Sequence, residues 1–306
     1  MRMIDRYAIV CLVIGLSACA PMRYPAVVDA GGCTVERVAL EDGVSQFQFN
    51  GLSPDGRMLA VGWERGGARG SYLLDLRTGA RSELPAVFDN GASFSPDGRK
   101  LISAVRTPDR RTDILELDRA CGATRLIASD PGADFLPSYS RDMSRVYFNS
   151  YRTGASDLYV ADLRTDTVQR LTTFDGYDAH AQLAPDQSRI AFHRNVGDNN
   201  YEVMLLDLRT GAERVLGASP GEDAYPAWSP DGRHLVFSST RASQSGRNDL
   251  HVMTADGQGI HRLTEGGNDT YAAWAPNGRE IYFVSRREGY GVYRLRLNRS
   301  LQCVGG

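Results

Sequence analysis

Short segments in which apolar and polar residues alternate run through most of the chain, and turn residues separate them. In the stretch 225–241, two such segments, 227–229 and 235–237, lie on either side of Pro-Asp-Gly at 230–232. Proline fixes φ before the bend, aspartate can bond to the nearby backbone, and glycine adopts a positive φ without steric cost. Because alternation with a period of two is typical of strands, the stretch predicts an antiparallel hairpin.

Five weaker copies of this turn recur along the chain. The six copies occupy residues 53–57, 95–99, 140–144, 184–188, 229–233 and 275–279. Their second residues are 42 to 46 positions apart, and the repeats hold short alternating segments throughout. A period of roughly 40 to 45 residues with four short strands per unit is typical of a propeller blade. We therefore predict an all-β fold, a six-bladed β-propeller with four-stranded blades.

The sixth repeat lacks its last strand, because only residues 298–306 follow its third strand. The segment 34–43, ahead of the first repeat, matches most positions of 167–176, which contains the last strand of the third repeat. We expect this N-terminal strand to complete the last blade, which closes the ring and removes an unpaired sheet edge.

The cysteines bear on this closure. Cys33 and Cys303 would flank one turn of the last blade, and a disulfide between them would close a very long loop and stabilise the ring. The alternative is two free buried thiols. Cys121, in the corresponding turn of the second blade, is either a free thiol or the partner of an intermolecular bond.

The first residues have the features of an export signal. Arg2 and Arg6 precede an apolar run at 8–16 that is too short to span a bilayer. The run leads into Leu-Ser-Ala-Cys at 16–19, which resembles the lipobox of bacterial lipoproteins. That resemblance implies cleavage before Cys19, which becomes the acylated N-terminus. The alternative is an ordinary secretory signal with a chance cysteine.

The chain thus divides into a signal peptide at 1–18, a lipidated N-terminus and linker at 19–32, the propeller at 33–303 and a tail at 304–306. Several acyl chains make membrane attachment stable, and the resemblance implies an anchor in the outer membrane, on the periplasmic side or at the surface. No other segment is long and apolar enough to span a membrane.

The formal charge of −2 argues against nucleic-acid binding, which needs a basic surface.

Two segments carry a family resemblance: Gly-Glu-Asp-Ala-Tyr-Pro-Ala-Trp-Ser-Pro-Asp-Gly-Arg at 221–233, and the strand ending His-Arg-Leu-Thr at 261–264. They resemble the Pro-Asp-Gly (PD40, WD40-like) repeats in the C-terminal propeller of the TolB family, the periplasmic component of the Tol-Pal envelope system. The resemblance covers about residues 33–303. It implies a monomeric propeller that binds an envelope protein or an extended peptide. The chain departs from TolB by having the predicted anchor and linker where TolB has an α/β domain.

An acidic residue recurs five positions before the large apolar residue that ends the first strand of each repeat after the first. These residues are Asp89, Asp134, Asp178, Asp223 and Asp269. All would stand near one mouth of the propeller channel, where they could hold Ca²⁺ or attract a basic peptide. The alternative is structural: each caps its own loop or pairs with an arginine of a neighbouring loop. The arginines in question are Arg65, Arg152, Arg241 and Arg287.

Other residues on the same predicted face do not recur from blade to blade. They are Trp63, Tyr151, Tyr177, His180, His193 and Arg194. Aromatic and arginine side chains are the usual anchors of protein interfaces, so we take these as binding candidates. The alternative is the ordinary scatter of aromatic residues on a surface.

The sequence offers little for catalysis. The five histidines show no metal-binding spacing, and Gly-Ala-Ser-Pro-Gly at 217–221 is not followed by the helix that a nucleophile elbow requires. We therefore predict a non-catalytic binding module without a cofactor, Ca²⁺ being the one ion that the aspartates would suit. The alternatives are an enzyme that uses the channel, as a metal-dependent hydrolase or lactonase, and a carbohydrate or peptidoglycan receptor.

Overall fold

The structure is a computed structural model, which describes residues 26–28, 34–40, 44, 46–89, 91–109, 111–198, 200–243, 245–298 and 301. All regular elements in these ranges are β-strands, and none of the described residues forms a helix able to cross a membrane. The predicted signal peptide, Cys19, Cys33 and Cys303 lie outside the described residues.

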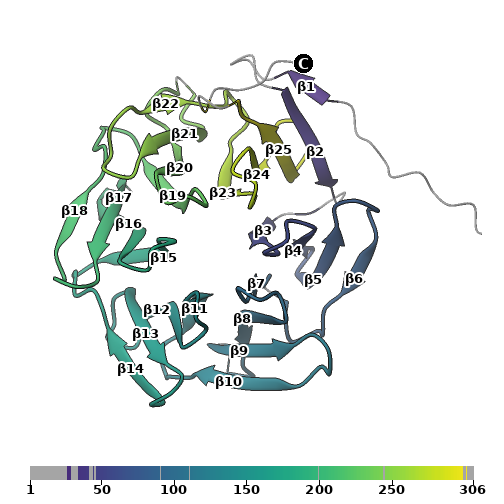
Figure 1. The fold of residues 1–306 in the computed structure, drawn as a ribbon, viewed down its shortest axis with the longest axis vertical. Helices are drawn as coiled ribbons and strands as arrows, with labels where there is room; N and C mark the ends of the chain where they lie inside the picture. The colour runs from purple at the N-terminus through teal and green to yellow at the C-terminus, as the bar shows by residue number, and fades with distance from the viewer. Residues whose placement is uncertain are drawn as a thin grey trace, which may run out of the picture.

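Six antiparallel sheets stand around a central axis, and each sheet is one blade (Figure 1). The predicted six-bladed propeller is confirmed. Within a blade the strands run from the axis outwards in the order A, B, C and D. The innermost strands A are β3 (Gln46–Leu52), β7 (Ser93–Phe94), β11 (Asp134–Tyr139), β15 (Tyr177–Leu183), β19 (Asp223–Trp228) and β23 (Thr270–Trp274).

The remaining strands continue each blade outwards. Strands B are β4 (Met58–Arg65), β8 (Lys100–Arg106), β12 (Arg145–Ser150), β16 (Arg189–Gly197), β20 (His234–Ser239) and β24 (Glu280–Ser285). Strands C are β5 (Ala68–Asp75), β9 (Thr112–Asp118), β13 (Asp157–Asp162), β17 (Asn200–Asp207), β21 (Asp249–Thr254) and β25 (Gly291–Arg296). Strands D are β6 (Arg81–Glu83), β10 (Thr124–Ala128), β14 (Thr167–Arg170), β18 (Glu213–Val215), β22 (His261–Arg262) and, in the last blade, β2 (Thr34–Leu40).

The Pro-Asp-Gly turns between strands A and B are fixed by their own side chains. In the first blade the Ser53 hydroxyl donates to the Asp55 carboxylate at 2.6 Å, and the same carboxylate accepts the Arg57 N–H at 3.1 Å. Gly56 has a φ of 70°, and a Cβ built on it would lie 3.3 Å from Pro276 of the last blade. Glycine therefore serves both the turn and the contact between neighbouring blades.

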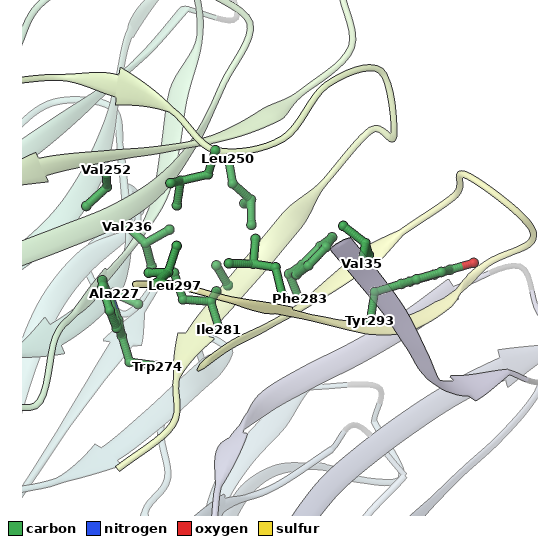
Figure 2. Close-up of a cluster of buried hydrophobic side chains, with 13 residues drawn as sticks. Val35, Ala227, Val236, Leu250, Val252, Trp274, Ile281, Phe283, Tyr293 and Leu297 are labelled. Atoms are coloured by element: carbon green, nitrogen blue, oxygen red, sulfur yellow. The ribbon is translucent and has the colours of Figure 1, made fainter. Parts of the chain in front are cut away.

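The N-terminal strand closes the ring, as predicted. β2 pairs with β25 from Val35 to Leu40, and the buried Val35 side chain packs with Phe283 and Tyr293 in a cluster shared by the last two blades (Figure 2). An ion pair between Glu36 and Arg294 also joins the two ends of the chain. Burial of apolar side chains on closure is the main stabilising contribution here.

The last blade has one strand more than predicted. β1 (Ala26–Val28), within the segment predicted to be a linker, pairs with the outer edge of β2. Two consecutive valines favour an extended backbone, and the added strand covers an edge that would otherwise be unpaired. Below, the loop face is the face with the D–A and B–C loops, and the turn face is the one with the Pro-Asp-Gly turns.

Candidate functional site

A bulge in strand A turns one side chain of several blades towards the channel. In blades three to six the pairing of strands A and B shifts register at the middle of strand A. The bulged residues are Leu136, His180, Tyr225 and Tyr271, with φ of 52°, 58°, 56° and 53°. A positive φ costs a non-glycine residue about 1–3 kcal/mol and is concentrated at functional sites, and bulges re-aim side chains.

Three of these bulged side chains meet near the axis. The ring centroids of His180 and Tyr225 are 4.6 Å apart, those of Tyr225 and Tyr271 4.4 Å, and those of His180 and Tyr271 5.4 Å. They come from blades four, five and six. Blades two and three have Gly91 and Leu136 at this position, so neither adds a ring to the three that come from blades four, five and six.

The ring contacts continue from the channel to the loop face. His193 lies 4.8 Å from His180 and 6.0 Å from Tyr177, and Tyr177 lies 6.5 Å from Tyr151. The chain of contacts is completed by Tyr201 and Phe135. We call the whole set the aromatic cluster: Phe135, Tyr151, Tyr177, His180, His193, Tyr201, Tyr225 and Tyr271.

The two histidines of the cluster are held neutral. The buried His193 accepts the Tyr225 N–H through Nδ1 at 3.2 Å, whereas both ring nitrogens of His180 are shielded from solvent and have no hydrogen-bond partner among the described residues. Desolvation lowers the pKa of His180 to about 3. Burial, and secondarily His180, keep the pKa of His193 well below its usual value.

Four of the five predicted aspartates are buried ion-pair partners. Asp134, Asp178, Asp223 and Asp269 have no exposed surface. Arg194 binds both carboxylate oxygens of Asp178, at 2.7 and 2.8 Å. The other three pair with Arg152 at 3.0 Å, Arg241 at 2.5 Å and Arg287 at 2.5 Å, respectively.

This arrangement matches the structural alternative stated for these residues, with Arg194 taking the same role in blade four. Burial raises the pKa of Asp134, although the Ser150 hydroxyl and the Arg152 guanidinium act in the opposite direction. An arginine of the B–C loop neutralises the carboxylate in blades three, five and six, and Arg194 of β16 does so in blade four. The pairs therefore tie the start of strand A to the B–C side of the same blade.

The remaining candidates lie in different surroundings. Asp89 is half-buried, and its Oδ1 has no hydrogen-bond partner among the described residues. Trp63 is half-buried in the first blade, where its ring packs over Gly70. His193 and Arg194 are buried within β16 and do not project from a loop. Tyr151 is 40% exposed on the loop face.

The sequence did not single out a second layer of buried acids at the start of strand C. Asp157 pairs with Arg170 at 2.6 Å, and Asp249 pairs with Arg262 at 2.7 Å. Glu202 is at the same position in blade four, where Val215 replaces the strand D arginine. Burial raises the pKa of Glu202, and its Oε2 lacks a hydrogen-bond partner among the described residues.

Four members of the aromatic cluster were also missed: Phe135, Tyr201, Tyr225 and Tyr271. Tyr225 and Tyr271 were not among the binding candidates, because the bulge that turns them towards the axis depends on strand pairing. The sequence holds one signal for the bulged rings. The residue before Pro or Ala in strand A is Leu136 in blade three, His180 in blade four, and Tyr225 and Tyr271 in blades five and six.

The turn-face half of the channel encloses a cavity of about 380 Å³, which we call the chamber. It reaches from the Pro-Asp-Gly turns inwards to the rings of His180, Tyr225 and Tyr271. Strand A residues of all six blades line it, among them Leu52, Phe94, Ser138, Gln182, Trp228 and Trp274. None of the described residues that line it has a charged side chain.

Comparison with known proteins identifies the type of propeller. The chain is 25% identical over 223 residues to the Tol-Pal system protein TolB of Francisella tularensis. The matched region covers 68% of this chain and 51% of that protein. The chain thus spans about half the length of this curated relative.

Among solved structures, TolB from Acinetobacter baumannii superposes with a TM-score of 0.65 and 24% identity, over 82% of this chain and 65% of that one. A gluconolactonase from Xanthomonas campestris superposes with a TM-score of 0.66 and 17% identity, over 90% and 98% of the two chains. At these identities both likenesses establish the fold alone. The family model described as the TolB beta propeller domain (PD40) matches residues 27–219 and 197–302. The chain therefore belongs to the TolB beta propeller family.

Proposed function

We propose that this protein is a non-catalytic binding module of the bacterial cell envelope, which holds an envelope protein or an extended peptide on its loop face. The observation that carries the proposal is the aromatic cluster, whose rings touch from the half-exposed Tyr151 to the channel. Large aromatic side chains gathered in one place are typical of the residues that dominate binding energy at protein interfaces.

The shape of the loop face supports the same proposal. The β16–β17 hairpin is longer than its counterparts, ends at Gly197 and brings Tyr201 beside Tyr177. Val196, near the tip of this hairpin, is 46% exposed. The exposed Val196 beside a row of tyrosines offers a partner an apolar contact.

Membership of the TolB beta propeller family supports a place in the cell envelope. A relative named for the Tol-Pal system is an envelope protein, and the predicted lipid anchor on Cys19 would hold this chain at the outer membrane, on its periplasmic side. The predicted linker enters at β1 and β2, at the outside of the last blade (Figure 1). Tyr151 belongs to blade three, across the ring from the last blade (Figure 1), so an anchored propeller would keep this part of the loop face accessible.

We infer no catalytic role for the aspartates. Four of the carboxylates are bound by arginine, which removes the free oxygens that a Ca²⁺ site needs. A reaction that used them would first have to break an ion pair in a buried environment, and this is costly.

The test is photo-crosslinking in the host cell. A benzoylphenylalanine replaces Tyr151 in the full-length lipoprotein, and the matched control carries it at Leu126, which is 56% exposed on β10 of blade two. We expect a discrete crosslinked envelope protein from position 151 and none from position 126. Replacing Tyr201 with Ala should lower the yield at least five-fold. Equal yields at both positions, or an undiminished yield with Tyr201→Ala, would refute the proposal.

A further inference from the structure

The chamber on the turn face has polar atoms that the fold leaves unused. Ser138 Oγ, both imidazole nitrogens of His180 and Trp274 Nε1 are buried and have no hydrogen-bond partner among the described residues. All three residues line the chamber. The equivalent tryptophan of blade five, Trp228, instead donates its Nε1–H to the Gln182 carbonyl at 2.9 Å. Because an unsatisfied buried polar atom costs about 1–3 kcal/mol, a hydrogen-bonding ligand would gain these bonds once small side-chain rotations in the chamber wall expose the atoms.

The lining sets the charge of that ligand. No carboxylate, ammonium or guanidinium group is among the described residues that line the chamber. A charged ligand would lose its hydration there without gaining an opposite charge, which is strongly unfavourable. The chamber therefore selects an uncharged molecule.

The positions of the polar atoms and rings in the chamber wall also indicate what kind of ligand fits. The unused atoms belong to blades three, four and six and so surround the axis, while indole and phenol rings occupy the space between them. A serine hydroxyl can donate or accept, a neutral imidazole does one of each, and an indole N–H donates. A peptide main chain needs partners in a row along a strand, whereas a sugar ring has hydroxyl groups around its circumference and apolar C–H faces.

We propose that the chamber binds an uncharged sugar, with a pyranose ring packed on the aromatic side chains and its hydroxyl groups bonded to Ser138, His180 and Trp274. The volume of about 380 Å³ is at the lower end of the range for small-molecule sites, roughly 300–1,000 Å³, and suits a mono- or disaccharide. The site opens on the face opposite Tyr151, but His180, Tyr225 and Tyr271 of the aromatic cluster form its inner wall. The two proposals therefore share three rings and rest on different observations.

The test uses full-length protein in a detergent without sugar groups. N-acetylglucosamine and its β-1,4-linked disaccharide are the neutral probes, and galacturonate and glucosamine are charged probes with a similar ring. We expect saturable binding of the neutral sugars in saturation-transfer NMR and in tryptophan fluorescence. Because they must be desolvated without a counter-charge, the charged sugars should bind at least ten-fold more weakly.

Two variants each remove one hydrogen-bonding group: Ser138→Ala deletes the hydroxyl, and Trp274→Phe deletes the indole N–H together with part of the ring. Ser138→Ala and Trp274→Phe should each weaken binding of the disaccharide about three- to ten-fold, as expected for one lost hydrogen bond, with unchanged circular dichroism. Tyr151→Ala, on the loop face, should bind sugar normally while losing its envelope partner, so failure of one proposal is distinguishable from failure of the other.

Three results would overturn the sugar site. The first is no saturable binding of any neutral sugar, and the second is equal affinity for galacturonate. The third is undiminished affinity in both Ser138→Ala and Trp274→Phe. A neutral Gly-Ser hexapeptide that binds more tightly than the disaccharide would assign the chamber to peptides instead.

Discussion

At the scale of single residues, the recurring aspartates illustrate how one pattern serves structure in several blades. Each lies beside the start of strand A, where its carboxylate pairs with an arginine of the B–C loop or, for Asp178, with Arg194 of β16. A buried pair adds little net stability, but removing one partner leaves an uncompensated charge. These residues therefore anchor the strand ends and loops next to the aromatic cluster.

Arg194→Met tests this role, because it leaves Asp178 buried without its bidentate partner. We expect the free energy of unfolding in urea to fall by about 3–5 kcal/mol. The control is Arg164→Met, which breaks an ion pair between Arg164 and Asp142. Their side chains are 72% and 50% exposed, so losing this pair should lower the unfolding free energy by less than about 1 kcal/mol. Similar losses in both variants would contradict the anchoring role.

The histidines of the aromatic cluster predict a dependence of stability on pH. The folded pKa of His180 is about 3 and that of His193 is also depressed, whereas the unfolded value is about 6.5. Unfolding therefore takes up protons below about pH 6.5, and the stabilisation present above that pH is lost as the pH falls towards 3. Between pH 6 and 5, His180→Phe should reduce the proton uptake on unfolding by nearly one. An unchanged slope of unfolding free energy against pH would show that His180 titrates normally.

At the scale of strands and loops, glycine sets how closely the D–A loop of a blade approaches the B–C loop. A Cβ on Gly132 would lie 2.5 Å from the Arg152 nitrogen and from the Tyr151 carbonyl carbon. A Cβ on Gly221 would lie 2.8 Å from the backbone nitrogen of Arg241. Since the opposing atoms belong to the backbone, the loops must move apart to accept a side chain.

Gly132→Ala should displace Tyr151 and Arg152 together. We expect a loss of about 1–3 kcal/mol in unfolding free energy from overpacking, and a clearly lower crosslinking yield from position 151. Gly122→Ala is the control, with a positive φ of 74° but open space around it. It should cost stability through backbone strain alone and leave crosslinking intact. Equal crosslinking in both variants would mean that the loops tolerate the shift.

At the scale of the whole molecule, stability depends on closure of the ring between β2 and β25. Val35 and Leu295 are both fully buried in the cluster between the last two blades. Without β2, strand β25 would become an exposed edge, and such edges pair with other molecules. The pairing of the two ends makes the propeller one cooperative unit.

Deleting residues 34–40, which form β2, should therefore lower the melting temperature by more than about 10 °C and cause aggregation in size-exclusion chromatography. Deleting 26–28, which form β1, should change both measurements little, because β1 covers only the outer edge of β2. Matching behaviour of the two deletions would show that the last blade is complete without β2.

The predicted Cys33–Cys303 disulfide belongs to the same closure and stays a prediction. Cys121 is an exposed free thiol, so it supplies an internal reference. In denatured, unreduced protein we expect alkylation of Cys121 but not of Cys33 or Cys303, and labelling of all three after reduction, as read by peptide mass spectrometry. Labelling of Cys33 without a reductant would exclude the bridge.

The architecture of this protein follows from periodicity and turn chemistry in the sequence. The period of the Pro-Asp-Gly turns specifies six blades, and the match between 34–43 and 167–176 specifies how the ring closes. These features are local: turn chemistry and strand alternation act within a few residues of one another. The acids at Asp134, Asp178 and their counterparts were also evident, because they recur with the same period.

Which of these residues contact one another depends on strand pairing and on the packing of the blades. Whether Asp178 was free for a ligand depended on Arg194, which the pairing of β15 with β16 brings to it. The aromatic cluster depended on bulges that turn Tyr225 and Tyr271 towards the axis, and the chamber on six strands facing one another across it. Contacts between blades join residues about 45 positions apart, so no local pattern in the sequence specifies them.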